Sequence, residues 1–251
     1  MSAALPLKLE PRAEALRPGL CLDGRYVLEE LIAQGGMGTV WRAEDLCPQP
    51  GMPASVAIKV MSQASSQDPS ARERFAREVE VMRSLHGAHT VAYFAHGEAE
   101  GLPFLVMELL RGEDLAARLA RYGRMSAGEC IPWLSQLLTG LAEAHEAGII
   151  HRDLSPRNIF FAHDDRGEET LKILDFGIAV SKRYQSRKAL TEPGTVIGSV
   201  HYMAPEQLRG LPLDFRADLW AVAVILYLAI IGRRPFEGKG MQPLAAILRD
   251  P

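Results

Sequence analysis

The stretch that decides the fold is His151–Asn158, which reads "HRDLSPRN". It places an acid, two arginines and an amide within eight residues, and Pro156 prevents the run from forming one continuous helix. Few structural loops need so many polar side chains. The rest of the chain has to account for this concentration of charge, and for Ser155 at its centre.

The bulk composition excludes several classes of protein. The 251 residues carry a net charge of -3, without the basic excess of a nucleic-acid-binding protein. The three cysteines fit no disulfide or metal spacing, which favours a reducing cytoplasm. The N-terminus lacks the apolar core of a signal peptide. The longest apolar run, 219–231, is too short to span a bilayer and predicts a central, buried helix, so we expect no membrane contact within this chain.

Hydrophobic patterning predicts an α+β chain of two lobes, the first rich in strands and with one helix, the second helical. Residues 1–24 are interrupted by prolines and glycines and predict a tail. The main helix begins after Asp68 and Pro69, and Ser126–Glu129 is a capping-box match that opens a second helix. Strands are expected at 25–33, 39–43, 55–61, near 90–95, 103–107, 159–162 and 171–174, and a last helix at 214–231.

Two features of the first lobe suggest contacts with anionic groups. Glycines 35, 36 and 38 join two strands, and such a turn lets backbone N–H groups approach a phosphate closely, although it is as often an ordinary turn. Lys59 lies in the apolar strand "SVAIKVM", on the same face as Ala57 and Met61, where it needs an anionic partner. The alternative is a lysine that protects an edge strand.

Four acidic or amide side chains complete the pattern. Glu78 lies beside the apolar stripe of its helix, where it could pair with Lys59 or remain solvated. Asn158 and Asp175 offer oxygen ligands from separate loops, as Mg²⁺ prefers, and Asp153 is a further acid that could orient a hydroxyl. Alternatively, Asp175-Phe176-Gly177 is an ordinary turn after a strand and Asn158 is a cap. Each structural alternative is plausible for one residue alone. It is not plausible for all five polar residues in this chain order: Lys59, Glu78, Asp153, Asn158 and Asp175.

The chain resembles the eukaryotic-type protein kinases, in particular the bacterial serine/threonine protein kinases. The resemblance rests on "VAIK" at 56–59, "HRD…N" at 151–158, "DFG" at 175–177 and "APE" at 204–206, with Glu78 on the helix after the lysine strand. It implies a bilobal kinase fold. Residues 25–110 would form the N-lobe and hinge, and residues 111–251 the C-lobe.

The resemblance assigns roles to these residues and implies ATP and Mg²⁺ as cofactors. Lys59 would hold the ATP phosphates and be positioned by Glu78, Asn158 and Asp175 would hold Mg²⁺, and Asp153 would accept the hydroxyl proton of the substrate. Asp218 would anchor the loop that carries Asp153. Further nucleotide contacts are expected from Gly35, Gly36, Gly38, Val40, Ala57, Met107, Glu108 and Leu110.

Regulation and substrates are implied in the same way. Arg152 would receive a phosphate from the activation loop, where Thr191 and Thr195 look like autophosphorylation sites rather than unmodified hydroxyls. The partners would be proteins with serine or threonine acceptors. Self-association would allow trans-autophosphorylation.

Three departures from the family pattern stand out. Ala33 occupies the first glycine position of the phosphate loop, and Ser155 replaces the lysine that usually follows the catalytic aspartate. We expect Arg157 to supply the missing cation, because arginine can contact phosphate oxygens bidentately, although it could equally be solvated. The family also continues beyond Pro251 with helices, one of which donates an arginine to Glu206, so we expect an incomplete C-lobe.

Two functions therefore compete. An active serine/threonine kinase is favoured by the five polar residues of the core motifs. A nucleotide-binding pseudokinase or incomplete domain, acting as an interaction module, is favoured by Ala33, by Ser155 and by the expected lack of the last C-lobe helices. A small-molecule phosphotransferase is less consistent with the "APE" segment.

Overall fold

The computed structural model describes residues 16–176, 198–238 and 242–249. The chain divides into two compact units, each with its own hydrophobic core. The first unit comprises Met1–Glu73 and Phe94–Leu109, and the second comprises Arg74–Tyr93 and Leu110–Pro251. Strands dominate the first unit and helices the second, as the α+β prediction requires.

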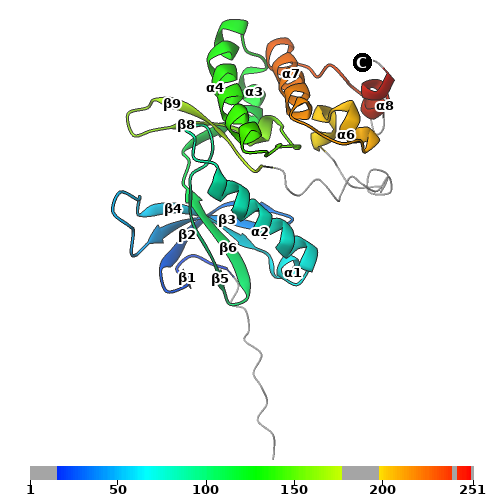
Figure 1. Cartoon of the computed structure of the whole chain (residues 1–251). Coiled ribbons are helices and arrows are strands. Elements are labelled where there is room, and N and C mark those ends of the chain that lie inside the picture. The colour runs from blue at the N-terminus through cyan, green and yellow to red at the C-terminus, as the bar shows by residue number, and fades with distance from the viewer. Residues whose placement is uncertain (1–15, 177–197, 239–241, 250–251) are drawn as a thin grey trace, which may run out of the picture. The chain divides into compact units, whose positions relative to one another are not determined.

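The first unit is built on an antiparallel sheet in the order β1-β2-β3-β4-β6-β5, shown in blue to green in Figure 1. Its strands are β1 Cys21–Leu22, β2 Tyr26–Gly35, β3 Gly38–Asp45, β4 Ser55–Met61, β5 Tyr93–Ala99 and β6 Leu102–Glu108. The sheet therefore begins inside the segment 1–24 that the sequence assigned to a tail. Cys21 and Leu22 pair with Val27 and Tyr26 of β2.

Strand β4 is covered on both faces. Val56, Ile58 and Val60 point into the core of the first unit, and the opposite face carries the buried Ala57 and Met61. The half-buried Lys59 lies between them along that second face. Because β4 pairs with β3 on one side and β6 on the other, the interpretation of Lys59 as an edge-strand lysine is wrong.

The helix predicted after Asp68 is present. Helix α2 spans Pro69–Ser84, and Asp68 Oδ1 accepts the backbone N–H of Ser70 at 2.9 Å. The apolar stripe is buried at Phe75 and Val79. A short helix, α1 Gln63–Ser66, precedes it and was not predicted from the sequence.

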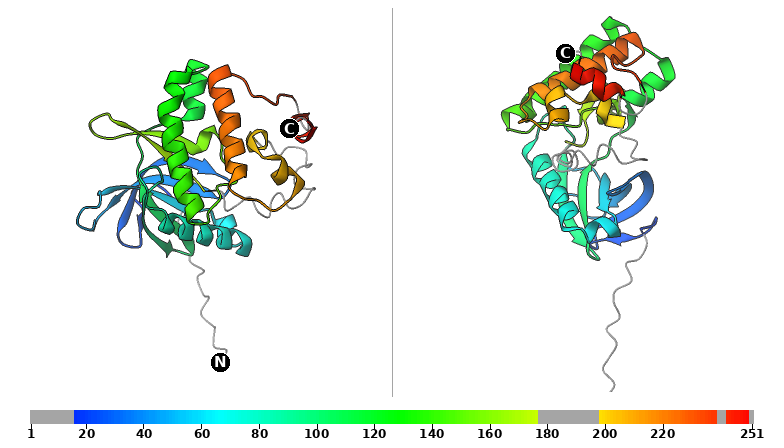
Figure 2. Two further views of the ribbon diagram at one scale, coloured as in Figure 1. Left: turned by 45° about the horizontal axis from the view of Figure 1, so that its top comes forward. Right: turned by 90° about the vertical axis from the view of Figure 1, so that its right-hand side faces the viewer.

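The second unit is mainly helical. It contains α3 Leu115–Tyr122, α4 Ala127–Glu146, α6 Pro205–Arg209, α7 Arg216–Ile231 and α8 Gln242–Arg249, with the 3-10 turns η1 Pro156–Asn158 and η2 Gly198–Tyr202. A small antiparallel sheet consists of β7 Gly112–Asp114, β8 Ile159–His163 and β9 Glu169–Ile173. Helices α4 and α7 run side by side (Figure 2) and enclose much of the core with this sheet.

Local sequence signals explain where α4 begins. Glu129 donates its backbone N–H to Ser126 Oγ at 3.3 Å, and Ser126 donates its backbone N–H to Glu129 Oε2 at 2.7 Å. These two bonds form the predicted capping box, which satisfies N–H groups that the first turn cannot pair internally. The prediction is confirmed.

The apolar helix α7 is only partly central. Ala217, Ala221 and Ile225 are buried on one side, but Leu219, Tyr227 and Ile231 are 40, 39 and 46% exposed. The prediction of burial all round is therefore wrong for one face, because a composition that is uniformly apolar cannot show which side a neighbour covers. Among the helices of the described residues, none combines the length and apolar character needed to cross a membrane.

Candidate functional site

The β8–β9 hairpin brings two predicted metal ligands to one end. Ile159 pairs with Ile173 in the antiparallel register, and Leu174 donates its backbone N–H to the carbonyl of Asn158 at 2.8 Å. Asn158, directly before β8, and Asp175, shortly after β9, therefore lie at the same end of the hairpin. Asp175 has a φ of 45°, in the left-handed region, and is exposed. Such a conformation in a non-glycine residue often marks a functional position.

A buried acid on α7 holds the loop that precedes Asn158. Asp218 is 1% exposed and accepts the backbone N–H groups of His151 at 2.8 Å and Arg152 at 2.9 Å. His145 Nε2 lies 2.8 Å from the same carboxylate. The predicted anchoring of the loop by Asp218 is confirmed, while the contact from His145 was not predicted.

Arg152 occupies a constrained position. Its φ is 66°, and its carbonyl accepts the side-chain amide of Gln207 at 2.7 Å. Its Nε atom is buried and has no hydrogen-bond partner among the residues that the structure describes. A buried guanidinium nitrogen of this kind is costly unless an anion reaches it.

His151 links this loop to the segment after β9. The side chain is fully buried, its Nε2 lies 3.0 Å from the carbonyl oxygen of Leu174, and its ring packs 4.9 Å from that of Phe176. We did not assign a role to His151 from the sequence. Its place directly before Arg152 and Asp153 is the signal that could have identified it.

The remaining residues of "HRDLSPRN" lie on the same loop. Asp153 is half-buried, and its backbone N–H donates to the His151 carbonyl at 2.9 Å. Arg157 is exposed on η1. Ser155 Oγ donates a hydrogen bond to Asn158 Oδ1 at 2.6 Å, a contact that was not predicted.

In the first unit, the glycine-rich turn closes the β2–β3 hairpin. Gly35 pairs with Gly38, and a Cβ atom on Gly38 would lie 2.0 Å from the carbonyl oxygen of Val60. Gly38 is therefore required by close backbone approach. Ser62 donates its backbone N–H to the carbonyl of Met37 at 3.0 Å, which ties the turn to the end of β4. Ala33 is extended in β2 opposite Val40, a conformation that alanine adopts without strain.

Other predicted nucleotide contacts share this sheet. Val40 pairs with Lys59 across β3 and β4, and Ala57 pairs with Met107 across β4 and β6. Glu108 is the last residue of β6 and is half-buried. Gly36 lies in the turn between β2 and β3. The other predicted contacts lie on adjoining strands of the same unit: Gly35, Gly38, Val40, Ala57, Lys59, Met107 and Glu108.

Several predicted residues are placed elsewhere. Glu78 is half-buried on α2, in the part of that helix assigned to the second unit, and Leu110 is half-buried at the start of the next segment of the same unit. The predicted pairing of Glu78 with Lys59 stays a prediction. Thr191 and Thr195 lie outside the described residues.

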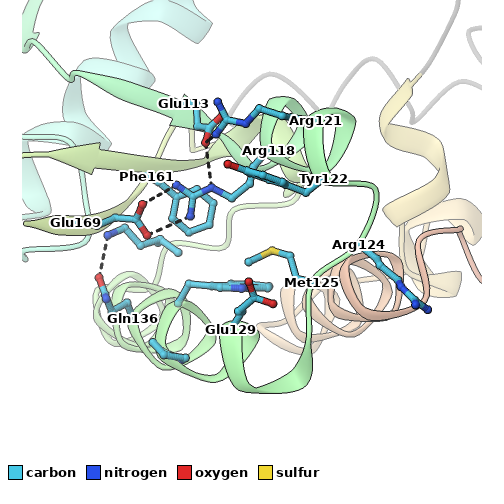
Figure 3. A pocket seen from close by; sticks show the side chains of 13 residues that line it. Glu113, Arg118, Arg121, Tyr122, Arg124, Met125, Glu129, Gln136, Phe161 and Glu169 are labelled. Carbon is cyan, nitrogen blue, oxygen red and sulfur yellow. Dashed lines mark hydrogen bonds and ion pairs between the residues drawn. The ribbon is translucent and has the colours of Figure 1, made fainter.

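A separate pocket of about 630 Å³ lies in the second unit, between α3, α4 and the small sheet (Figure 3). Arg118 donates to Glu113 and Glu169 at 3.1 Å and stacks 3.7 Å over the ring of Phe161. The Arg118 guanidinium lowers the pKa of the Glu169 carboxyl. None of the predicted site residues lines this pocket, and these charges satisfy one another, so we interpret it as structural.

Comparison with known proteins agrees with this arrangement. The family model for the protein kinase domain matches residues 26–250. The chain is 40% identical over 221 residues to serine/threonine-protein kinase pkn3 of Myxococcus xanthus, covering 87% of this chain and 40% of that protein. It is 38% identical over 234 residues to serine/threonine-protein kinase PknA of Mycobacterium tuberculosis, covering 91% of this chain and 52% of that protein.

Solved structures show the same relationship. The PknI kinase domain of Mycobacterium tuberculosis matches with a TM-score of 0.68 at 29% identity, covering 94% of this chain and 86% of that structure. The chain spans about half the length, or less, of the two curated relatives above. The fold is therefore the bilobal kinase fold that the motifs predicted, and the chain belongs to the protein kinase domain family.

Proposed function

We propose that this chain is a serine/threonine protein kinase domain that transfers the γ-phosphate of ATP to serine and threonine hydroxyls of proteins. One observation carries the proposal: Asn158 and Asp175 share one end of the β8–β9 hairpin, and Asp153 lies on the loop that leads into it. The names of relatives that are 38 and 40% identical support the same substrate class.

The donor chemistry of the hairpin end fits Mg²⁺. An amide oxygen and a carboxylate are hard ligands, and Mg²⁺ in kinases is held by one or two such groups together with phosphate oxygens. We assign Asn158 and Asp175 to this role. When bound, the ion would neutralise charge on the transferring phosphate.

Residues of the first unit would bind the nucleotide. Lys59 would contact the α- and β-phosphates through its ammonium group, and its half-buried position between Ala57 and Met61 limits competition from water. Backbone N–H groups at Gly35, Gly36 and Gly38 would approach the phosphates. Val40, Ala57 and Met107 would line the adenine site, where backbone groups of Glu108 and Leu110 would bond the base.

Chemistry would then rest on positioning. Asp153 would accept the proton of the acceptor hydroxyl, and Arg157, which is exposed, would supply the cation that a lysine at 155 normally provides. Glu78 would position Lys59. This division of roles matches phosphoryl transfer, in which orientation and charge neutralisation dominate catalysis.

Activation would use the half-buried side chain of Arg152. Phosphorylated Thr191 or Thr195 could supply the anion that its buried Nε otherwise lacks within the described part of the chain. The proposal includes phosphorylation of these threonines by a second copy of the chain. This trans-autophosphorylation requires the two copies to associate.

The test is incubation of the chain with Mg²⁺, γ-labelled ATP and a generic basic acceptor protein, with Asp153→Asn as the control. We expect incorporated label that depends on Asp153 and that mass spectrometry assigns to serine and threonine residues, including Thr191 or Thr195. ATP binding without any transfer would overturn the proposal and leave a nucleotide-binding pseudokinase.

A further inference from the structure

We propose that Ser155 is a positioning residue that orients the side-chain amide of Asn158 for metal binding. The inference deepens the proposed function and rests on it. It explains the feature of "HRDLSPRN" that departs most from the family pattern: a short hydroxyl stands where a long cationic side chain is usual.

The backbone brings the two side chains together. Ser155 is the N-cap of η1, with φ -150° and ψ 166°, and its carbonyl accepts the backbone N–H of Asn158 at 2.9 Å. Pro156 is the first residue of the turn, and its ring fixes the entry angle. In a 3-10 turn, side chains three residues apart eclipse one another, so Ser155 faces Asn158 directly.

The contact itself is short and local. Ser155 Oγ donates to Asn158 Oδ1 at 2.6 Å. An N-cap serine usually turns its oxygen toward the N–H groups of its own turn, but Ser155 makes no such cap bond. Its hydroxyl instead holds the amide oxygen that we assign to the metal.

Orientation matters because the Asn158 amide has no other fixed partner within the part of the chain that the structure describes. Among the described residues, no other hydrogen bond reaches the Asn158 side chain. An amide oxygen has two lone pairs, so the bond from Ser155 leaves one available for a cation. Without Ser155 the amide could rotate, and part of its free energy of metal binding would be lost to ordering.

The expected magnitude follows from partners of metal ligands in general. Loss of a residue that hydrogen-bonds to a metal ligand typically weakens metal binding by about 10- to 100-fold. A lysine at this position would carry a charge to the phosphate, whereas serine acts only on its neighbour. The serine and Arg157 would therefore divide between them two tasks, ligand orientation and charge.

The primary test is direct metal binding to the full chain. Mn²⁺, a paramagnetic substitute for Mg²⁺, is titrated in the presence of a non-hydrolysable ATP analogue, and the free ion is measured by electron paramagnetic resonance. We expect Ser155→Ala to raise the Kd for Mn²⁺ about tenfold. Ser155→Thr, which keeps the hydroxyl, should bind Mn²⁺ more tightly than Ser155→Ala and close to the wild-type affinity.

Matched controls separate positioning from stability. Ser84 also makes a local hydrogen bond, from Oγ to the carbonyl of Val81 at 2.8 Å, so Ser84→Ala should leave Mn²⁺ binding unchanged. The metal-free affinity for the nucleotide should not change in Ser155→Ala. If that variant fails to fold, Ser155→Cys retains the volume with a much weaker donor and should bind Mn²⁺ less tightly than wild type.

A double-mutant cycle tests whether Ser155 acts through Asn158. In an Asn158→Ala background, Ser155→Ala should have no further effect on the Kd for Mn²⁺. Equal Mn²⁺ affinity in wild type and Ser155→Ala, or additive effects in the cycle, would overturn the inference. Failure of the wild-type chain to bind Mn²⁺ with the analogue would instead remove the metal site of the proposed function, so the two failures are distinguishable.

Discussion

The carboxylate of Asp218 accepts the backbone N–H of Arg152 at 2.9 Å, which fastens the loop 151–158 to the core helix α7. Arg152 itself has a left-handed φ of 66°. A buried charge therefore compensates for an unfavourable backbone conformation, and the loop carrying Asp153 depends on the core for its shape.

Asp218→Asn should destabilise the second unit. Two backbone donors and His145 share the carboxylate, and an amide would turn an N–H group toward one of those donors. We expect the free energy of unfolding to fall by about 2–4 kcal/mol. Urea denaturation measures this change. Asp214→Asn is the control, since Asp214 is 46% exposed and pairs with exposed Arg216. Equal loss in the two variants would contradict the anchoring role.

Gly38→Ala should weaken nucleotide binding and loosen the β2–β3 hairpin. The added Cβ atom would lie 2.0 Å from the Val60 carbonyl oxygen, so one of the two strands must shift. Gly36→Ala is the matched control, because its Cβ would meet nothing within 4 Å. Calorimetric titration with ATP should show a loss of affinity of about tenfold or more for Gly38→Ala and much less for Gly36→Ala. The reverse order would show that the close approach at Gly38 is unimportant.

The Arg25–Asp45 ion pair should make the stability of the first unit depend on pH in the acidic range. Arg25 donates two bonds of 2.7 Å to the buried Asp45 carboxylate, which lowers the pKa of Asp45 from its ordinary value. Because the folded-state pKa is depressed, this contribution is complete above about pH 5 and is lost as pH falls through the folded pKa. Asp45→Asn should cost about 1–3 kcal/mol at pH 7.

Urea unfolding of wild type and Asp45→Asn at pH 7 and pH 3 checks this expectation. The difference between the two proteins should shrink at the lower pH. Asp165→Asn, at a side chain that is 94% exposed, should show little difference at either pH. A difference for Asp45→Asn that stays constant with pH would contradict the assignment.

Arg157→Ala should lower kcat if Arg157 supplies the cation missing at position 155. A charge-assisted hydrogen bond to phosphate contributes about 1.5–3 kcal/mol, so kcat should fall by about 10- to 150-fold. Arg157→Lys should retain part of the activity, since it keeps the charge without the bidentate geometry. Steady-state kinetics with Arg166→Ala, an exposed arginine in the β8–β9 turn, gives the baseline. An unchanged kcat in Arg157→Ala would contradict this hypothesis.

Local signals in the sequence predicted much of the fold. Pro69 and the Ser126–Glu129 capping box mark helix starts because the groups involved interact within one turn. Strand β4 matches "SVAIKVM" residue for residue, since alternation and β-branched side chains agree there. The exposed side of α7 and the short elements β7 and α8 depend on tertiary contacts that no local pattern records.

In the candidate site, too, some features follow from local sequence and others depend on tertiary contacts. Motif spacing predicted Asp153, Asn158 and Asp175 as site residues, and the pairing of Ile159 with Ile173 brings the last two to one end of the β8–β9 hairpin. The bond between Ser155 and Asn158 could not be predicted, because a serine before a proline has many competing partners. Position alone could have singled out His151, but its burial and its contact with the Leu174 carbonyl depend on the fold.

The β8–β9 hairpin has two ends with different tolerance for change. The strand register beside Asn158 and Asp175 is fixed by its cross-strand partners, whereas the connection 164–168 at the opposite end is an exposed turn closed by Asp164, whose Oδ1 accepts the backbone N–H groups of Arg166 and Glu168. The length of this turn can vary without altering the separation of Asn158 and Asp175. That turn is accordingly a permissive point for inserting an epitope or a fluorescent reporter.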